Sequence, residues 1–367
     1  MNMEKISAQR DLGRQYGLYG PLAIFSGTAN PELAREIAEE LERPLGNVTI
    51  RQFANENVFA KLNESVRGQD VFLIQPTCTG TRNRIHRTGE CVVAPEDVAR
   101  LRPEAFEQVS ASVNDNILEL LVLLDTLRRD SAGRLTAVVP YFAYGRTDKK
   151  DQPRVPITAR LLADVIGAAG ASRFLVLDLH AGQIQGFFDI PGDELTACHL
   201  LVDYFREKAI SNAVVVAPDI GASRRARNFA EELDLPLAII EKRRHADGSG
   251  TRQLNLIGNV EGRKAIIFDD EIDTGGTIRQ AADFVRACGV QDVYACATHA
   301  LLSPPLGVEN MLAAGLKELV VTNTVYLSPE KRQALRSFLR VLSVAKLLAE
   351  VIRRIHLGVS VGELFNE

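Results

Sequence analysis

The sequence predicts an α/β protein built from two tandem lobes, each with a doubly wound parallel sheet. Three observations lead to this prediction. Short apolar runs typical of buried strands alternate with longer runs of helical character. The alternation occurs once in each half of the chain, as expected for two lobes of similar layout. The length of 367 residues also suits about two domains of ordinary size.

The composition narrows the possible classes of protein. Apolar residues make up 46% of the chain and charged residues 25%, as in ordinary soluble globular proteins. The sequence contains no apolar run of about 18 residues, so we expect no membrane span. The net charge of −4 gives no reason to expect a nucleic-acid partner. The five cysteines are scattered without metal-ligand spacing, which indicates reduced thiols and a cytoplasmic protein.

The first lobe is expected at residues 20–192, after a polar leader at residues 1–19. Pro31 suits the first turn of a helix, and Gly167 and Gly170 suit the end of another. The predicted strands are residues 22–25, 71–74, 135–139 and 174–177, and the predicted helices are residues 32–41, 117–127 and 157–166.

The second lobe is expected at residues 193–352. Residues 344–355 place apolar side chains on one helical face, which is typical of a packing helix. Residues 353–367 are expected to pack back on the first lobe. The predicted strands are residues 213–216, 237–240, 265–268, 292–297 and 319–321, with a helix at residues 223–233.

The most informative motif lies at residues 264–278. An apolar run predicts a buried strand, acidic residues follow where it would end, and Thr274-Gly275-Gly276-Thr277 leads into a predicted helix. Glycines at such a turn let backbone N–H groups and the positive end of the helix hold a phosphate. The carboxylates of Asp269 and Asp270 suit sugar hydroxyls, or magnesium with its waters. The motif therefore predicts a site for a phosphorylated pentose, although Gly-Gly after a strand is often only a tight turn.

Two further motifs carry metal-binding or cationic side chains. His180 follows the predicted strand at residues 174–177, at the strand end where open α/β sheets bind ligands. It suits a metal ligand, although a single histidine is more often structural. Lys242-Arg243-Arg244 follows the predicted strand at residues 237–240. This run suits a mobile arm that closes over a polyphosphate, although basic runs are usually solvated turns.

Together these motifs resemble those of one family. The motif at residues 264–278 resembles the phosphoribosyl-diphosphate motif of phosphoribosyltransferases and of ribose-phosphate diphosphokinases (PRPP synthetases). Residues 178–189 closely resemble the metal-binding signature of PRPP synthetases, which phosphoribosyltransferases do not carry. The resemblance runs from about residue 22 to residue 365, so the chain is identified as a member of the PRPP synthetase family. It implies two sheet lobes of the phosphoribosyltransferase type.

The resemblance also implies a reaction and its participants. ATP would transfer its β,γ-diphosphoryl group to the 1-hydroxyl of ribose 5-phosphate, giving PRPP and AMP, with Mg²⁺ as the cofactor. A homo-oligomer is implied, a hexamer in many family members. The implied catalytic residues are Lys242 and Arg244, and the implied metal ligands are His180 and Asp219. The implied nucleotide-binding residues are Phe53, Asn55, Glu56, Asn57, Arg146 and Thr147, and the implied ribose-5-phosphate-binding residues are Asp269, Asp270, Asp273, Thr274, Gly275, Gly276 and Thr277.

The chain departs from the family pattern in two places. The adenine-contacting loop, usually Phe-Ser-Asp-Gly-Glu, is Phe53-Ala54-Asn55-Glu56-Asn57 here, and residue 147, usually glutamine, is threonine. Asparagine both donates and accepts hydrogen bonds, which predicts altered or looser nucleotide selection. An apparent insertion spans roughly residues 81–112. It is expected to be either a solvated excursion or a subunit contact or regulatory site.

Two other functions stay open on the sequence. A catalytically silent regulatory subunit would resemble the enzyme, and the altered loop at residues 53–57 mildly favours it. The intact Lys242, Arg244 and motif at residues 269–277 argue against it. A phosphoribosyltransferase would use finished PRPP and a base, but the His180 segment and the second lobe argue against that function. We therefore expect an active PRPP synthetase.

Overall fold

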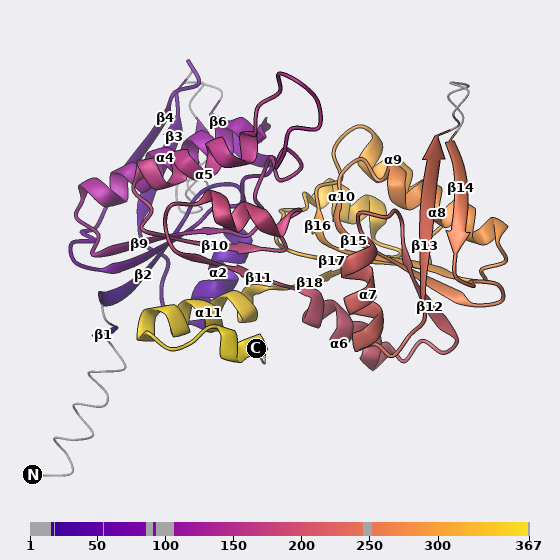
Figure 1. Cartoon of the computed structure of the whole chain (residues 1–367). Helices are drawn as coiled ribbons and strands as arrows, with labels where there is room; N and C mark the ends of the chain where they lie inside the picture. The colour runs from indigo at the N-terminus through magenta and orange to yellow at the C-terminus, as the bar shows by residue number, and fades with distance from the viewer. Residues whose placement is uncertain are drawn as a thin grey trace, which may run out of the picture. The chain divides into compact units, whose positions relative to one another are not determined.

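The structure is a computed structural model, and it describes residues 16–17, 19–53, 55–85, 91–92, 106–244 and 252–365. The chain divides into two compact units (Figure 1). One unit comprises residues 1–195 and 344–367, and the other comprises residues 196–343. Each unit contains a largely parallel sheet with helices, which confirms the predicted α/β class.

The first unit is built on a six-stranded sheet with the order β1-β2-β5-β9-β10-β11. Neighbours from β2 to β11 run parallel, and β1 is antiparallel to β2. Helices α4 and α5 lie on one face of the sheet, and α2 and α11 lie on the other (Figure 1). The strands are β1 (Tyr16–Gly17), β2 (Gly20–Ser26), β5 (Asp70–Ile74), β9 (Arg134–Val139), β10 (Arg173–Leu177) and β11 (Gly192–Leu195). The helices are α2 (Pro31–Glu40), α4 (Val113–Arg129), α5 (Thr158–Ala169) and α11 (Ala345–Leu357), with short 3₁₀ turns η2 (Gly182–Phe187) and η3 (Gly362–Phe365).

Capping side chains fix where two of these helices begin. The Asn30 side chain accepts a hydrogen bond of 3.2 Å from the backbone N–H of Leu33, and Pro31 occupies the first turn of α2, as predicted. Ser112 and Asp115 form a capping box at the start of α4. Both helices therefore begin where the sequence supplies acceptors for their first N–H groups.

A buried ion cluster joins the C-terminal helix to the first sheet. Asp70 of β5 is fully buried and accepts hydrogen bonds of 2.7 and 2.6 Å from the guanidinium of Arg134. Nδ1 of His356 in α11 lies 2.8 Å from the same carboxylate, and Arg134 also donates to the carbonyl of Ile355 at 2.9 Å. The C-terminal segment that belongs to the first unit therefore begins at Val344 instead of residue 353. The helix predicted at residues 344–355, which was expected in the second lobe, is α11 of the first unit.

Replacing Asp70 with alanine tests this cluster. The D70A substitution leaves Arg134, whose side chain is 12% exposed, without its carboxylate. Loss of one partner of a buried ion pair costs about 3–5 kcal/mol, so we expect calorimetry to show a clear drop in the midpoint of thermal unfolding. Asp125→Ala is the control, because Asp125 pairs with the exposed Arg128 and Arg129 and surface pairs contribute little. Equal effects of the two substitutions would contradict the role of the cluster.

The first unit also contains a five-stranded antiparallel sheet with the order β4-β3-β7-β6-β8. The apparent insertion at residues 81–112 supplies β7, β8 and most of β6, so part of it extends a sheet. Residues 86–90 and 93–105 lie outside the described residues, and a role of the insertion in subunit contact or regulation stays a prediction. The strands are β3 (Val48–Gln52), β4 (Val58–Leu62), β6 (Gly80–Ile85), β7 (Cys91–Val92) and β8 (Phe106–Ala111).

The second unit is built on a seven-stranded sheet with the order β14-β13-β12-β15-β16-β17-β18. β14 is antiparallel to β13, and the other neighbouring strands run parallel. The strands are β12 (Ala213–Ala217), β13 (Leu237–Arg244), β14 (Arg252–Ile257), β15 (Lys264–Ile272), β16 (Val293–Ala300), β17 (Glu318–Thr322) and β18 (Leu339–Leu342). The helices are α6 (Cys198–Lys208), α7 (Ser223–Glu232), α8 (Gly276–Ala287), α9 (Leu306–Ala313) and α10 (Pro329–Leu335).

Two hydrophobic cores enclose the second sheet, because successive residues of a strand point to opposite faces. Val214 and Val216 of β12 pack with residues of α8, α9 and α10. Val215, between them, packs with residues of α6 and α7 on the other face. There Phe268 of β15 stacks on Phe229 of α7, with ring centroids 4.4 Å apart. Helices cover both faces, which confirms the doubly wound second lobe.

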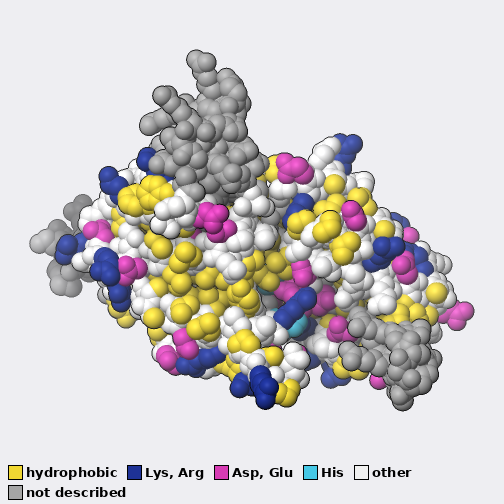
Figure 2. Space-filling view, turned by 90° about the horizontal axis from the view of Figure 1, so that it is seen from above, with side chains coloured by type: hydrophobic (Ala, Val, Ile, Leu, Met, Phe, Trp, Pro, Cys, Tyr) yellow, Lys and Arg dark blue, Asp and Glu magenta, His cyan; other side chains and the backbone are white. Residues whose placement is uncertain are grey.

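The surface and the thiols agree with the composition. Lys and Arg side chains are interspersed with Asp and Glu on the face shown in Figure 2, as expected for a small net charge. The cysteines whose side chains are described, Cys78, Cys198, Cys288 and Cys296, are free thiols. Among the helices in the described ranges, none combines the length and the apolarity that crossing a bilayer requires.

Candidate active site

The strand order of the second sheet reverses at β12. β13 lies on one side of β12, and β15, the next parallel strand along the chain, lies on its other side. Open α/β sheets bind ligands outside the carboxyl ends of the strands at such a switch point. Asp219 follows β12, and Asp269 lies near the carboxyl end of β15. The topology therefore brings together two predicted site residues that are far apart in the sequence.

Strand β15 is longer than predicted. It runs to Ile272 instead of ending at residue 268, because Asp269 and Glu271 continue the parallel pairing with Ala297 and His299 of β16. The prediction that the acids follow the strand is therefore wrong for Asp269, Asp270 and Glu271, whereas Asp273 does follow it. Asp269, Asp270 and Glu271 lie in the last part of β15. Hydrogen bonds to the neighbouring strand β16 hold the backbone there, so the side chains have fixed directions.

Two adjacent aspartates at this strand end have different surroundings. Burial raises the pKa of Asp269 well above its ordinary value, and the neighbouring carboxyl groups of Asp270 and Asp219 raise it further. Asp270 instead pairs with Arg225 of α7, whose Nη2 lies 2.7 Å from Oδ1. One carboxyl is thus held by a guanidinium, while the other is crowded by negative charge. A magnesium ion, or hydrogen bonds donated by the hydroxyl groups of a sugar, would reduce the repulsion between these carboxylates.

Arg225 is a candidate site residue that sequence reasoning does not find, because it pairs with Asp270. It lies between two other arginines at the start of α7, and the sequence alone does not distinguish the three. In the structure Arg224 and Arg227 are exposed, whereas Arg225 is half-buried against Asp270. One feature of the sequence could have indicated Arg225. It lies in the first turn of the helix that follows β12, and from there a long side chain can reach the switch point.

Arg225→Gln tests whether this cation positions Asp270. The glutamine stays polar but removes the charge that faces a carboxylate only 3% exposed. A hydrogen bond to a charged group contributes roughly 1.5–3 kcal/mol, so we expect about tenfold or greater loss of ribose 5-phosphate affinity in titration calorimetry. Arg225→Lys should recover part of the loss, and Arg227→Gln, on the exposed side of the same helix, should bind like the unaltered protein. Unchanged affinity in R225Q would remove Arg225 from the site.

A glycine in the left-handed conformation turns the chain from β15 into α8. Gly275 has a φ of 72° and directly precedes the helix. A Cβ at this position would lie 2.7 Å from Cε of Met311 and 3.2 Å from Cβ of Asn310. The Asn310 side chain also donates a hydrogen bond of 2.8 Å to the carbonyl of Thr274. Helix α9 therefore braces the turn and leaves room only for glycine.

The turn directs free donors into the space beyond the strand end. The first N–H groups of a helix have no acceptor within it, and here they belong to Gly276, Thr277 and Ile278. These donors and the positive end of the helix dipole favour a phosphate. Asp273 and Thr274 precede them, and the carbonyl of Asp273 is fixed by a 3.0 Å hydrogen bond from the N–H of Ser303.

Gly275→Ala measures how much this turn matters. Alanine carries a cost of about 1–2 kcal/mol for the left-handed backbone, and its Cβ would also displace Met311. We expect a lower midpoint of thermal unfolding and weaker ribose 5-phosphate binding. Gly262→Ala is a matched control, because Gly262 has a φ of 68° and nothing within 4 Å of an added Cβ. The account fails if G275A and G262A lose the same stability and both keep full affinity.

The predicted catalytic residues lie on a two-stranded ribbon. β13 pairs with β12 over residues 237–239 and then continues to Arg244 beside β14. Lys242 is paired with Leu254, so the basic run belongs to the strand that it was expected to follow. Positions 242 and 244 share one face of the ribbon, because residues alternate along a strand. The loop of the expected mobile arm, at residues 245–251, lies outside the described residues.

In the first unit, two neighbouring loops carry predicted site residues. Arg146 and Thr147 follow β9, and His180 follows β10, at the carboxyl ends of adjacent parallel strands. The loops touch, since a Cβ added to Gly145 would lie 3.1 Å from Cβ of His180. The Thr147 hydroxyl donates a 2.7 Å hydrogen bond to the carbonyl of Tyr144, while Arg146 is exposed. The structure thus brings these three predicted residues together.

The predicted adenine-contacting loop is the turn of the β3–β4 hairpin. The N–H of Phe53 donates to the carbonyl of Asn57 at 2.9 Å, and the N–H of Glu56 donates to the carbonyl of Phe53 at 2.8 Å. The N–H of Asn57 donates to the Asn55 side chain at 3.3 Å. Phe53 is 41% exposed, and the three polar residues are exposed. The turn therefore presents an aromatic ring and amide groups to solvent.

The carboxylates at the switch point fit magnesium better than His180 does. The described part of the chain has no group of three or more His, Cys, Asp or Glu side chains that could hold a metal ion. Magnesium prefers oxygen ligands and keeps several waters, so one or two carboxylates, such as those of Asp219 and Asp269, would suffice to hold it. One Asp219 oxygen accepts a 3.0 Å hydrogen bond from the N–H of Ala222, which orients the carboxylate. Metal binding by His180 and Asp219 stays a prediction.

These features define a class of protein: an α/β protein of two parallel-sheet lobes with acids and a glycine turn at a switch point. Comparison with known proteins makes the class more specific. The family model for the N-terminal domain of ribose phosphate pyrophosphokinase matches residues 22–170. The model for the phosphoribosyl synthetase-associated domain matches residues 249–366.

Relatives match over most of their length. The chain is 44% identical to the ribose-phosphate pyrophosphokinase of Caldanaerobacter subterraneus, over 94% of this chain and 98% of the relative. It is 44% identical to the chloroplastic ribose-phosphate pyrophosphokinase 1 of Oryza sativa, over 93% of this chain and 78% of the relative. The crystal structure of the phosphoribosylpyrophosphate synthetase from Mycobacterium smegmatis superposes with a TM-score of 0.76 at 39% identity, over 91% of this chain and 98% of that one. The chain belongs to the ribose-phosphate pyrophosphokinase family.

Proposed function

We propose that this protein is an active ribose-phosphate diphosphokinase that makes PRPP and AMP from ribose 5-phosphate and ATP in the cytoplasm. The observation that supports it most is the set of aspartates and free helix N–H donors at the switch point of the second sheet, in a chain of this family. A pentose phosphate has both features that this set suits, a phosphate for the start of α8 and hydroxyls for the carboxylates.

The proposed site residues of the second unit would bind the two polar parts of ribose 5-phosphate. Asp273, Thr274, Gly275, Gly276 and Thr277 would hold the 5-phosphate, and Asp269 and Asp270 would hold the ribose hydroxyls. The 1-hydroxyl would then attack the β-phosphorus of ATP as the bond from that phosphorus to the α,β-bridging oxygen breaks and AMP leaves. Such a transfer needs alignment and positive charge more than covalent help. Mg²⁺, when bound, would offset charge on the phosphates.

The nucleotide would be bound by residues of the first unit. Arg146 would contact phosphate, with Thr147 next to it on the same loop and His180 on the neighbouring loop. Phe53 would stack on the base, and Asn55, Glu56 and Asn57 would contact its edge. Because the two asparagine side chains both donate and accept hydrogen bonds, they can accommodate bases other than adenine.

A silent regulatory subunit is the second candidate, and the changed turn at residues 53–57 is the observation that favours it. Lys242, Arg244 and Asp269 are retained, which favours activity. A phosphoribosyltransferase is less favoured, because family membership extends over both lobes. Incubation with ribose 5-phosphate, Mg²⁺ and ATP, GTP or CTP decides among them. We expect release of the nucleoside monophosphate, with a weaker preference for ATP than a relative with the usual loop shows. If no triphosphate yields a monophosphate, the proposal is wrong.

Lys242→Ala tests the catalytic role of the ribbon. Loss of one positive charge at the transition state should lower turnover by roughly two to four decades while ribose 5-phosphate affinity changes little. Arg243→Ala is the matched control, since position 243 lies on the opposite face of the strand and should keep turnover within a few-fold. An equal loss of affinity and turnover in K242A would contradict the assigned role.

We also propose that the chain forms a homo-oligomer, a hexamer as the family resemblance implies. The insertion would change subunit contacts, since it adds strands to an antiparallel sheet whose outer strands β4 and β8 have free edges within the described residues. Deleting residues 81–111 keeps Ser112, which caps α4. Light scattering after gel filtration should show a change in assembly mass. An unchanged mass would mean that the insertion is not a subunit contact.

A further inference from the structure

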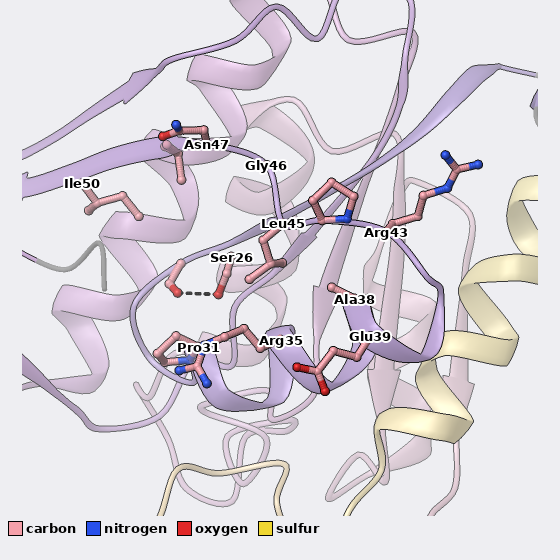
Figure 3. A pocket seen from close by; sticks show the side chains of 13 residues that line it. Ser26, Pro31, Arg35, Ala38, Glu39, Arg43, Leu45, Gly46, Asn47 and Ile50 are labelled. Atoms are coloured by element: carbon pink, nitrogen blue, oxygen red, sulfur yellow. Dashed lines mark hydrogen bonds between the residues drawn. The ribbon is translucent and has the colours of Figure 1, made fainter. Parts of the chain in front are cut away.

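A cavity of about 430 Å³ opens on the first unit, and none of the residues that line it is a predicted site residue (Figure 3). Helix α2 forms one wall, and the segment from Arg43 to the start of β3 forms the other. Its apolar lining includes Pro31, Ala38, Leu45 and Ile50. Cavities of roughly 300–1,000 Å³ with such linings are typical of small-molecule sites.

The rim of the cavity carries three charged side chains. Arg35 and Glu39 lie one turn apart on α2, and Arg43 follows the end of this helix. All three are exposed, and their side chains form no hydrogen bond or ion pair with the residues that the structure describes. The rim thus offers two guanidinium groups and one carboxylate, with a net charge of +1.

The backbone that lines the cavity is already satisfied. The N–H of Gly46 donates to the carbonyl of Ile24 at 2.7 Å, and the N–H of Gly27 donates to the carbonyl of Ile74 at 3.0 Å. The hydroxyl of Ser26 donates to the carbonyl of Gly27 at 2.7 Å (Figure 3). The interior of the cavity is therefore apolar, and its polar groups named here already have hydrogen-bond partners. A charged group of a ligand would be bound at the rim.

The walls are held apart by tight packing behind them. A Cβ on Gly46 would lie 2.4 Å from the ring of Phe25, so this segment lies directly on the first core. Leu45 also forms a parallel bridge with Ile24 of β2. Helix α2 is fixed on its other side by α11, through contacts that include the donation of Arg353 to the carbonyl of Glu40 at 3.1 Å. Both walls are thus anchored, and the cavity does not collapse by a side-chain shift alone.

We propose that this cavity binds a small molecule with one compact ring system and one phosphate or carboxylate group. The ring would occupy the apolar interior, and the guanidinium of Arg35 or that of Arg43 would hold the anion, because guanidinium forks match carboxylate and phosphate oxygens. The two side chains point away from one another at opposite ends of the cavity (Figure 3), so each offers a separate position for the anion. A ring of this kind is offered by nucleoside monophosphates and by aromatic acids, and the two sources share the same recognition chemistry.

The place of the cavity gives such a ligand an effect on the proposed reaction. Val48 and Ile50 line the cavity and belong to β3, whose far end carries the turn at residues 53–57. A ligand that packs against β3 would fix the base of the hairpin that presents this turn, and it would change the KM for the nucleoside triphosphate. This consequence rests on the proposed function, whereas binding itself does not.

Titration calorimetry with the full chain tests the binding. The probes are uridine 5′-monophosphate and 1-naphthoate, with 1-naphthol as the uncharged control. We expect one site per chain for at least one anionic probe, with affinity at least tenfold lower in the double variant R35Q/R43Q and unchanged in R129Q, an exposed arginine of α4. The probe that binds identifies the source of the ring. Both rim arginines are exposed, so their replacement leaves the core intact.

Three results would overturn the proposal: neither anionic probe binds at millimolar concentration, R35Q/R43Q binds as the unaltered protein does, or 1-naphthol binds equally well. Val48→Phe gives a second check, because the larger side chain should fill the cavity and abolish binding without a lower midpoint of thermal unfolding. A KM for ATP that stays constant when the probe saturates its site would overturn the coupling to β3 alone. Binding without any turnover would instead count against the proposed reaction.

Discussion

The crowding of carboxylates at the end of β15 is the constraint on which the proposed chemistry depends. Asp269 and Asp270 are adjacent on a buried strand, and Asp219 faces them from the end of β12. Such a set is costly to bury unless cations or hydroxyl donors come to it. Arg225 supplies one cation to Asp270. The carboxylate of Asp269 still needs a cation or hydroxyl donors, which a hydrated magnesium ion or a sugar would supply. The burial of negative charge would therefore also favour binding of the ligand.

The fold keeps this set in place through elements that do not contact a substrate. Two cores hold the second sheet from both faces, and α9 braces the turn at Gly275. In the first unit, Asp70, Arg134 and His356 tie the returning helix α11 to the sheet. Each lobe therefore has its own rigid support for the strand ends and turns that carry the predicted site residues.

Much of the fold could be predicted from the sequence, because buried parallel strands leave short apolar runs. The runs at residues 71–74 and 213–216 correspond to β5 and β12. The end of β15 could not be predicted this way, since its last residues are acidic and are kept in the strand by pairing with β16. The hairpin β3–β4 could not be predicted either, because its half-exposed antiparallel strands have weak apolar patterns. Arg225 was missed because its role depends on a partner in another element.

The central claim is that a pentose phosphate is held with its phosphate at the start of α8 and its hydroxyls at Asp269 and Asp270. A crystal structure of the protein with ribose 5-phosphate and Mg²⁺ tests it most directly. The account predicts phosphate oxygens within hydrogen-bonding distance of the N–H groups of Gly276 and Thr277. A phosphate bound anywhere else in the molecule, with this turn vacant, would contradict it.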